Sequence, residues 1–484
     1  MTASDAPLID RERQLEELRA LSARPGPQLA LLYGRRRVGK TYLLDRAWGD
    51  ERSFYFLAGD TTPTRNRIDL LGELGAWTGR DIDPDDYPNW RTVFRLLADL
   101  ARDEPLVIIL DEFQYLMGRR EGIVSQLNAV WDREVEGRDL TIVLCGSAVA
   151  TMKGLESGDS PLYGRINWRE RLTPFDYRDA ARMVPERARR EQAYLYGVYG
   201  GIPQYLAAIG SDEPLDEAVV RTFLSHRGEI HLQLENLIEQ EKGIRDAATY
   251  RAVLEAVARG YTGTNEIAQA AGMQGQTDSV RRILETLEEL ELIWRERNFD
   301  AGSRAPWRNR IADNAVRFFY QFVHPQRSRL ARGGEREVWT SQVEPNLDTY
   351  MGKVYETICR QAFRRHHARW GLPAAVRWAR WEGQDRNRRP IEIDIVAELD
   401  DGLLLTGEVK WSSTPVDFDL HFNLVRDLED LGHSGRGWAR GAHSVAESHG
   451  HIYFSAAGFT DAFEQRAADN DRIHLVTLDD LYVE

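Results

Sequence analysis

Lysine and cysteine are both scarce in this chain. Of its 63 basic residues, only five are lysine and the other 58 are arginine. The two cysteines, Cys145 and Cys359, are too few and too far apart to suggest a disulfide framework or a zinc site. No apolar run approaches the length of a membrane span, and the first residues lack the pattern of a signal peptide. We therefore expect a cytoplasmic protein without membrane contact.

The balance of charge is acidic, with a formal net charge of −14. This argues against a general coat for nucleic acid. It leaves room for a local basic track, because the arginines are clustered. A length of 484 residues and a hydrophobic fraction of 42% predict a globular chain of two to four domains.

The first third of the chain alternates apolar strands with helical patterns, which is typical of a parallel α/β sheet. The expected strands are 29–33, 53–57, 106–110, 141–145 and 166–172. We expect these parts: a nucleotide-binding core at 1–180, a helical lid at 181–245, a winged helix at 246–325, a linker at 326–345 and a mixed α/β domain at 346–484.

The segment GRRRVGKT (34–41) fits the phosphate-binding pattern G-x-x-x-x-G-K-[ST], and it lies between an expected strand and an expected helix. Gly34 and Gly39 would let backbone N–H groups close around phosphate oxygens, next to the positive end of the helix dipole. Lys40 would reach the terminal phosphates of ATP, and the Thr41 hydroxyl would bind Mg²⁺.

A second buried strand ends in two acids, in PLVIILDEFQYL (105–116). Asp111 lies where ligands meet the carboxyl edge of a parallel sheet, and it suits a contact to Mg²⁺. Glu112 suits a base that aligns the attacking water. Ser147 follows the next strand, where a polar side chain could sense the γ-phosphate. The acids favour ATP hydrolysis over ATP binding alone.

Seven segments together resemble the archaeal-type AAA+ ATPase family, which is related to the signalling ATPases with a winged-helix lid. They span roughly residues 6–325: LIDRERQLEEL, GRRRVGKT, LDEFQYL, LCGSAVATM, PLYGR, LTPFDYRDA and YGGIPQYL. The resemblance implies adenine packing near Ile9 and a lid turn at Pro203 that closes over the nucleotide. It also implies a homo-oligomer in which Arg165 acts as an arginine finger in a neighbour's site. The family usually has Gly or Asn where this chain has Asp10.

The segments 264–273 and 277–293, followed by a strand pair, have the order of a winged helix. The start of the second helix could meet bases, but its later turns are rich in glutamate, which repels phosphate. The region could therefore contact DNA or simply pack against its neighbours. The arginines that would make the contact are Arg281, Arg282, Arg304, Arg308 and Arg310.

Lys410 stands out, since a chain that uses arginine almost everywhere keeps a lysine two residues after Glu408 on an apolar strand. The preceding strand carries Glu392 and Asp394 on one face. A three-residue turn at 400–402 would set Asp394 opposite Glu408, and Glu392 opposite Lys410. A two-residue turn would put the acids on opposite faces. The sequence permits both.

Two carboxylates that face each other would attract a divalent cation, and oxygen ligands suit Mg²⁺ or Mn²⁺. Lys410 could orient the water or stabilise developing charge on a phosphate. This D…E-x-K arrangement resembles the PD-(D/E)xK nuclease superfamily. The resemblance implies that Glu356, on an upstream helix, completes the metal site beside Asp394 and Glu408.

Taken together, these patterns predict an ATP-hydrolysing AAA+ protein whose metal-dependent nuclease domain cleaves nucleic acid, with double-stranded DNA as the expected partner. The alternative is a nucleotide-driven switch that binds a protein or DNA partner and carries an inactive nuclease-like tail. An ordinary hairpin with salt bridges on its solvent face is a further alternative for the tail. We expect several histidines to be surface or loop residues: His421, His433, His443, His449 and His451.

Overall fold

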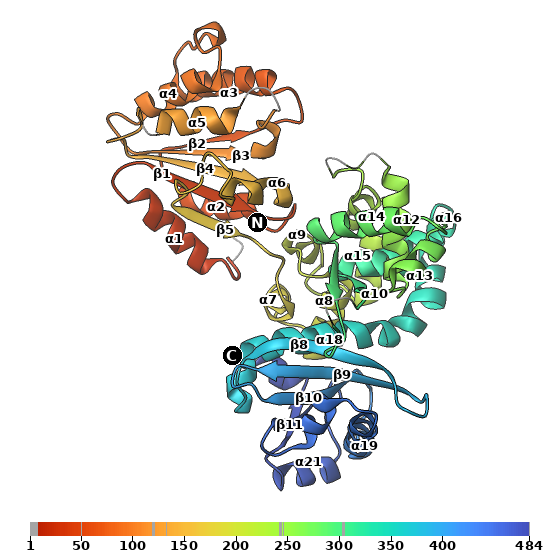
Figure 1. Cartoon of the computed structure of the whole chain (residues 1–484). Coiled ribbons are helices and arrows are strands. Elements are labelled where there is room, and N and C mark those ends of the chain that lie inside the picture. The colour runs from red at the N-terminus through yellow and green to blue at the C-terminus, as the bar shows by residue number, and fades with distance from the viewer. Residues whose placement is uncertain are drawn as a thin grey trace. The chain divides into compact units, whose positions relative to one another are not determined.

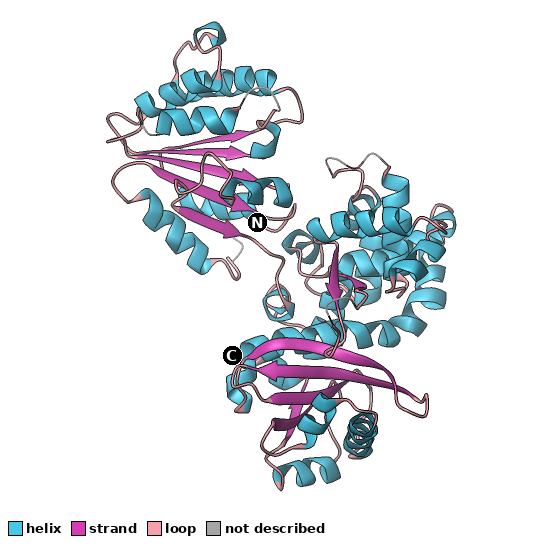
Figure 2. Cartoon of the chain, viewed as in Figure 1, coloured by secondary structure: helices cyan, strands magenta, loops and turns pink. Residues whose placement is uncertain are grey.

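The computed structural model describes residues 8–49, 51–118, 122–131, 133–241, 244, 246–302 and 305–483. It divides into two compact units. The N-terminal unit runs through Phe175 and includes Ile202–Gln204, and the C-terminal unit holds Asp176–Gly201 and the chain from Tyr205 onward. Figures 1 and 2 show the elements of each unit. None of the described helices is both long enough and apolar enough to cross a lipid bilayer.

A five-stranded parallel sheet in the order β2-β3-β4-β1-β5 forms the centre of the N-terminal unit. The inner strands are buried along their whole length, which explains their unbroken apolar sequences. The parallel sheet that the sequence predicts is therefore confirmed. The strands are β1 (Gln28–Tyr33), β2 (Ser53–Leu57), β3 (Leu106–Asp111), β4 (Leu140–Gly146) and β5 (Trp168–Arg171).

Helices cover both faces of this sheet (Figure 1). On one face lie α3 (Pro63–Thr78), α4 (Trp90–Leu100) and α5 (Ile123–Trp131), whose apolar residues join one large buried cluster. On the other face lie α1 (Glu12–Ser22) and α2 (Lys40–Trp48). The short α6 (Val149–Lys153) follows β4. The carboxyl ends of β1, β3 and β4 lie at the same edge, where α2 begins.

The C-terminal unit begins with helices and a small two-stranded sheet. The three helices between residues 247 and 289 come directly before the antiparallel strands β6 (Ile293–Glu296) and β7 (Arg308–Ile311), in the order that the sequence predicts. The helices up to this point are α7 (Tyr177–Ala181), α8 (Arg189–Tyr199), α9 (Pro203–Ala207, shared with the N-terminal unit), α10 (Leu215–Val219), α11 (Glu229–Glu235), α12 (Ala247–Ala258), α13 (Thr264–Ala270) and α14 (Thr277–Glu289).

The segment 326–345, which we expected to be a linker, is folded. It contains α16 (Arg327–Leu330), α17 (Glu335–Val338) and a π-helical turn, Trp339–Val343, and it follows α15 (Asn314–Phe318). Leu330, Val338, Trp339 and Val343 are buried. The expectation was wrong because two adjacent glycines, a proline and a π turn interrupt the helical repeat, so the apolar residues no longer recur every three or four positions.

A mixed five-stranded sheet in the order β12-β11-β10-β9-β8 closes the C-terminal unit. Strands β8 to β10 pair in antiparallel fashion, and β10 to β12 pair in parallel. The strands are β8 (Ala375–Gln384), β9 (Pro390–Leu399), β10 (Leu404–Lys410), β11 (Ser448–Ser455) and β12 (Ile473–Thr477).

The long helix α18 (Leu347–His366) lies on one side of this sheet (Figure 1). On the other side are α19 (Asp419–His433), α20 (Gly437–His443) and α21 (Asp461–Ala468), whose apolar residues form the second large buried cluster. The mixed α/β domain expected after residue 346 is therefore present.

Two of the histidines expected at the surface or in loops are placed differently. His451 is buried in β11, and its Nδ1 lies 2.7 Å from the Thr406 hydroxyl. His421 is half-buried, with Nδ1 2.8 Å from the hydroxyl of Tyr453. Burial lowers the pKa of His421, and it lowers the pKa of His451 to about 3 with help from the neighbouring His421 and His443.

Candidate functional site

The phosphate-binding loop connects the buried β1 to α2, as its sequence predicts. Gly34 has φ +154°, and a Cβ atom there would lie 2.2 Å from the carbonyl oxygen of Leu172, so no side chain fits. Gly39 has φ +94° and caps the start of α2. Lys40 is buried, and its ammonium donates to the carbonyls of Gly34 at 2.9 Å and Arg35 at 3.1 Å. The ammonium is thus held over the loop that would cradle a phosphate.

Thr41 and Asp111 meet at the carboxyl end of β3. The Thr41 hydroxyl donates to Asp111 Oδ2 at 3.2 Å, and the Tyr55 hydroxyl donates to the same oxygen at 2.6 Å. Burial and the Asp111 carboxylate both raise the pKa of Tyr55, so Tyr55 stays a donor. A hydroxyl and a carboxylate side by side fit the hard ligand set that Mg²⁺ prefers. Tyr55 is a participant that no pattern in the sequence indicates.

Glu112 has a left-handed backbone, with φ +52°, which turns its carboxylate away from the strand direction. The Ser147 hydroxyl donates to Glu112 Oε2 at 2.7 Å, and the Gln114 amide donates to the same oxygen. A side chain at Gly146 would come within 2.5 Å of the Gln114 amide oxygen, so Gln114 would have to shift to accommodate it. Glu112, Ser147 and Gln114 therefore form one cluster beside the loop, and Gln114 is a member that sequence reasoning missed.

The remaining residues expected at the nucleotide site are distributed around the N-terminal unit. Ile9 is buried. Asp10 has φ +54°, a conformation that Gly and Asn adopt easily and that Asp also tolerates. Pro203 begins α9 and groups with the N-terminal unit. The backbone N–H of Arg165 donates to the carbonyl oxygen of Leu162 at 3.0 Å, in the segment before β5. The expected roles of Ile9, Pro203 and Arg165 stay predictions.

A second site lies in the C-terminal unit, where the turn between β9 and β10 sets the pairing. Leu399 N–H donates to the carbonyl of Leu403 at 2.9 Å, and Gly402 takes φ +80°. The strand register continues to the pair Ile395–Gly407. The three-residue turn predicted as one of two possibilities is therefore confirmed, and it carries Asp394 and Glu408 to the same side.

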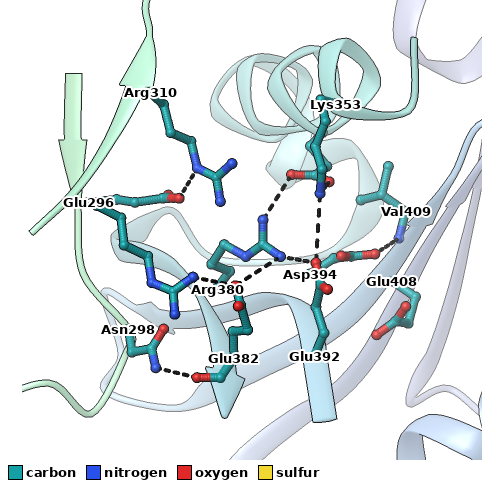
Figure 3. Close-up of polar contacts among 12 residues, drawn as sticks. Glu296, Asn298, Arg310, Lys353, Arg380, Glu382, Glu392, Asp394, Glu408 and Val409 are labelled. Carbon is teal, nitrogen blue, oxygen red and sulfur yellow. Dashed lines mark hydrogen bonds and ion pairs between the residues drawn. The ribbon is translucent and has the colours of Figure 1, made fainter. Parts of the chain in front are cut away.

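Three charged groups converge here: Asp394, Glu408 and Lys410. Lys410 Nζ lies 2.7 Å from Glu408 Oε2 and 3.4 Å from Asp394 Oδ2, and Asp394 Oδ2 also accepts the Val409 N–H at 3.1 Å. The side chains of Glu408 and Asp394 are only 11% and 10% exposed. Figure 3 shows Asp394 linked to Val409 at this edge.

Burial, followed by the Asp394 carboxylate, raises the pKa of Glu408 to about 8. Burial alone would lower the pKa of Lys410, but the two carboxylates outweigh it and raise the pKa. Lys410 therefore stays a cation, which suits charge stabilisation and not proton abstraction. With a pKa near 8, Glu408 is mostly protonated at neutral pH, so the charges of Asp394 and Lys410 balance each other in this buried place.

A divalent cation fits this pair of acids. It would displace the proton of Glu408, and Asp394 and Glu408 would then offer oxygen ligands of the kind Mg²⁺ and Mn²⁺ prefer. Within the described residues, no three side chains of His, Cys, Asp or Glu are grouped closely enough to hold a metal ion by themselves. The other ligands would have to come from water, backbone or substrate.

Glu356 and Glu392 are placed differently from the expectation. Glu356 forms ion pairs with Lys353 at 2.9 Å and Arg380 at 3.7 Å, so it does not join Asp394 and Glu408 in one group. Glu392 pairs with Arg380 and with Lys353 at 3.7 Å, and it is not paired with Lys410, because the ladder between β9 and β10 ends at the pair Ile395–Gly407. The buried Arg380 pairs with both acids, and no pattern in the sequence indicates this cluster.

The winged-helix arginines expected to contact DNA are mostly engaged within the chain. Arg281 pairs with Asp278 at 3.0 Å, and Arg282 donates to the Asp278 carbonyl at 3.3 Å. Arg310 pairs with Glu296 (Figure 3), and Arg308 pairs with Glu382. Arg304 lies outside the described residues. These contacts favour the packing interpretation of the region over a DNA-reading surface.

Two family matches divide the chain. Residues 8–209 match a family described as an ATPase domain predominantly from Archaea. Residues 319–419 match a family described as archaeal and bacterial proteins of unknown function. The first match, together with the loop geometry above, assigns an ATPase domain to the front of the chain. The second names no activity for the C-terminal unit.

Similar proteins come from archaea. The chain is 25% identical over 411 residues to MJECL04, an uncharacterized protein of Methanocaldococcus jannaschii, covering 83% of this chain and 87% of that protein. MJ0424 of the same organism is 39% identical over 62 residues, which are 13% of this chain and 60% of that protein.

Among solved structures, the chain is similar to the Walker-type ATPase PABY2304 of Pyrococcus abyssi. The TM-score is 0.50 at 22% identity, and the alignment covers 66% of this chain and 99% of that one. At this identity the likeness shows a shared fold and not a shared partner. The fold therefore agrees with the ATPase assignment of the front of the chain.

Proposed function

We propose that this protein is an AAA+ ATPase whose C-terminal unit is a metal-dependent nuclease under nucleotide control, with DNA as its substrate. The observation that carries the nuclease half is the convergence of two buried carboxylates, Asp394 and Glu408, on the single ammonium of Lys410. The ATPase half rests on the phosphate-binding loop and on the acids at the end of β3.

In the N-terminal unit, each clustered side chain has a task in hydrolysis. Lys40 neutralises charge on the terminal phosphates, and Thr41 and Asp111 would hold Mg²⁺. The bound ion would supply positive charge near the phosphate oxygens. Glu112 accepts the proton of the attacking water, while Ser147 and Gln114 hold its carboxylate in place. Ile9 and Pro203 would flank the nucleotide.

Arg165 completes the ATPase proposal as an arginine finger. It would act in a neighbouring copy of the chain, so hydrolysis would need a homo-oligomer. The support is the resemblance of the PLYGR segment to ring-forming ATPases. A rate of ATP hydrolysis per chain that does not change with protein concentration would contradict the arginine-finger proposal and leave the rest of the ATPase proposal unaffected.

In the C-terminal unit, Asp394 and Glu408 would hold the metal ion. The ion would supply positive charge at the scissile phosphate and make a bound water more acidic. Lys410 donates to the phosphate oxygens or orients the water, which its raised pKa permits at neutral pH. Asp394 is oriented by the Val409 N–H at 3.1 Å.

Nucleotide control is supported by the path of the chain. It passes from the N-terminal unit at Phe175, returns for Ile202–Gln204, and leaves again at Tyr205. The returning segment includes Pro203, which the family resemblance places over the nucleotide. A change at the nucleotide site would therefore act on a segment that is covalently tied to the C-terminal unit at both ends.

A nucleotide-driven switch with an inactive tail is the second candidate. The pairing of Glu356 with Lys353 and Arg380 favours it, since those cations occupy the carboxylate that would complete a three-acid metal site. In that case the tail would bind its partner without cutting it.

Nuclease assays on three DNAs separate the candidates: a closed plasmid, a linear duplex and a single strand, each with Mg²⁺ or Mn²⁺ and with ATP or ADP. We expect cleavage that Lys410→Ala abolishes and that Lys40→Ala lowers at least tenfold, with ATP hydrolysis lost only in Lys40→Ala. Lys153→Ala, an exposed lysine outside both sites, is the matched control.

The outcomes are distinct. No cleavage of any DNA under any condition would overturn the nuclease and leave the switch. Cleavage that survives Lys410→Ala would show that the site is misassigned. Loss of cutting in Lys410→Ala with full cutting in Lys40→Ala would remove nucleotide control while keeping the nuclease.

A further inference from the structure

A cavity of about 590 Å³ lies inside the C-terminal unit, between α18, the β6–β7 hairpin and the strands β8 to β10. Asp394, Glu356 and Val409 are part of its wall, so it reaches Asp394, one of the two acids of the proposed nuclease. Its size is within the range of pockets for small organic ligands. Figure 3 shows part of its polar wall, including Arg310, Lys353, Arg380 and Asp394.

The wall of this cavity is strongly cationic, although the whole chain is acidic. Seven arginine or lysine side chains line it, against three carboxylates. Arg317, Arg360 and Arg364 make no ion pair with any carboxylate among the residues that the structure describes, and the buried Nε of Arg360 has no hydrogen-bond partner there. Arg317 donates only to the carbonyl of Ile311, at 3.1 Å.

Burial lowers the pKa of Arg317 and of Arg360, because a guanidinium loses hydration there without gaining an anion. An unpaired charge in a partly enclosed place is costly. A phosphate group would remove that cost with charge-assisted hydrogen bonds, for which the planar guanidinium is well suited.

Flat aromatic faces accompany the arginines. Trp294 and Trp378 both line the cavity, and the Arg360 guanidinium lies 5.2 Å from the centre of the Trp294 ring. Arginine and tryptophan together provide the combination that binds single-stranded nucleic acid, since the cation takes the phosphate and the ring stacks on a base.

The segment after β6 is tied to strand β8, whose residues Trp378, Ala379 and Arg380 line the cavity. The Phe299 N–H donates to the Arg380 carbonyl at 3.1 Å, and the Asn298 amide donates to the Glu382 carbonyl at 2.7 Å. The Trp381 indole donates to Asp300 at 3.0 Å. This segment is therefore held along β8, next to Arg380 of the cavity wall.

We propose that the cavity binds the phosphorylated end of a single nucleic-acid strand, with the phosphate on Arg317, Arg360 and Arg364 and a base against Trp294. The inference rests on the proposed function and names its substrate class. It narrows the expected double-stranded DNA to DNA with an accessible single-stranded end, and it makes Arg360 and Arg364 binding residues of the same site.

Binding is measured by fluorescence anisotropy in the full-length Lys410→Ala variant, with saturating ADP so that the phosphate-binding loop is occupied. The probe is a labelled ten-residue thymidine strand that carries a 5′-phosphate. We expect Arg360→Gln and Arg364→Gln each to weaken binding about tenfold or more. Arg426→Gln, an exposed arginine on α19 far from the cavity wall, should bind as the parent does.

Arg364 is exposed, so its variant should fold even if Arg360→Gln does not, and thermal unfolding checks both. Unchanged affinity in a folded Arg364→Gln variant would overturn the inference. So would a blunt duplex that binds as tightly as the single strand, or thymidine monophosphate that competes at the same concentration as the strand, since the ligand would then be a free nucleotide.

The test does not depend on cutting, because the parent variant lacks the proposed catalytic lysine. If the chain binds the strand, the arginine variants lose that binding, and no nuclease activity is found, strand binding in the cavity is supported and the nuclease is contradicted. In a chain that retains Lys410, cleavage of closed plasmid that neither Arg360→Gln nor Arg364→Gln reduces would support the nuclease and contradict strand binding in the cavity.

Discussion

The nucleotide site is built around one eight-residue loop, whereas the carboxylate site combines Asp394 on one strand with Glu408 and Lys410 on the next. The loop is fixed by local backbone demands, such as the φ of +154° at Gly34. The carboxylate site exists only if the strand pairing is right, because a shift of one residue would turn its acids to the other face. The residues of a local site can be predicted from the sequence alone. The residues of a site that depends on strand register can be predicted only if the length of the turn between the strands is known.

The largest expected effect falls on the local site. Glu112→Gln should lower the rate of ATP hydrolysis at least a hundredfold, because the amide cannot accept a proton from water. Nucleotide affinity should be kept, and nuclease activity with saturating ATP should change less than hydrolysis. Hydrolysis assays and nucleotide titrations check this. Glu104→Gln, an exposed acid, is the control, and a hydrolysis rate equal to the control would show that Glu112 is not the base.

The next effect concerns the packing of the register-dependent site. Gly407 lies on β10, and a Cβ there would come within 2.0 Å of the Ile452 carbonyl oxygen. We expect Gly407→Ala to lower the free energy of unfolding of the C-terminal unit by about 3 kcal/mol. Gly402→Ala meets no atom within 4 Å but keeps a positive φ, so it should cost only about 1 kcal/mol.

Urea unfolding followed by pulse proteolysis, with fragments of each unit identified by mass, measures both glycine variants. The N-terminal unit should keep its midpoint in each. Equal losses for the two variants would mean that the close approach of β10 and β11 is not what requires a glycine at position 407.

The smallest expected effect is a difference between the two units in how their stability depends on pH. All eleven histidines lie beyond residue 175, and His451 has a pKa of about 3 in the folded chain, because burial disfavours its charged form. An unfolded histidine titrates near 6.5, so below that pH the unfolded state binds the extra proton and stability falls with acidity. At pH 5 this single group should cost the C-terminal unit about 2 kcal/mol.

The same proteolysis experiment at pH 7.5 and pH 5 tests the difference. The C-terminal unit should lose stability and the N-terminal unit should change less. His451→Gln should reduce the pH dependence, while His433→Gln, an exposed histidine, should leave it unchanged. Equal pH dependence of the two units would contradict the explanation.

Much of this architecture could be predicted from sequence, and the failures have physical causes. The five strands of the parallel sheet, Gly34 to Thr41, and the turn at 400–402 follow from local patterns. Tyr55 was missed because its partner Asp111 lies on another strand, and Gln114 because it also contacts Ser147, which follows the next strand. The ion pairs of Arg380 were missed because they depend on the pairing of β8 with β9 and on the position of α18. The helices between 326 and 345 were missed because breaks within them hide their repeat.

The strands of the nucleotide-binding sheet all occur between Gln28 and Arg171. During synthesis, this sheet can be complete before most of the remaining chain leaves the ribosome. The mixed sheet has to wait for Ile473–Thr477, its last strand. Every newly made molecule would thus pass through a stage in which the ATPase domain is folded and the sheet of the proposed nuclease is not.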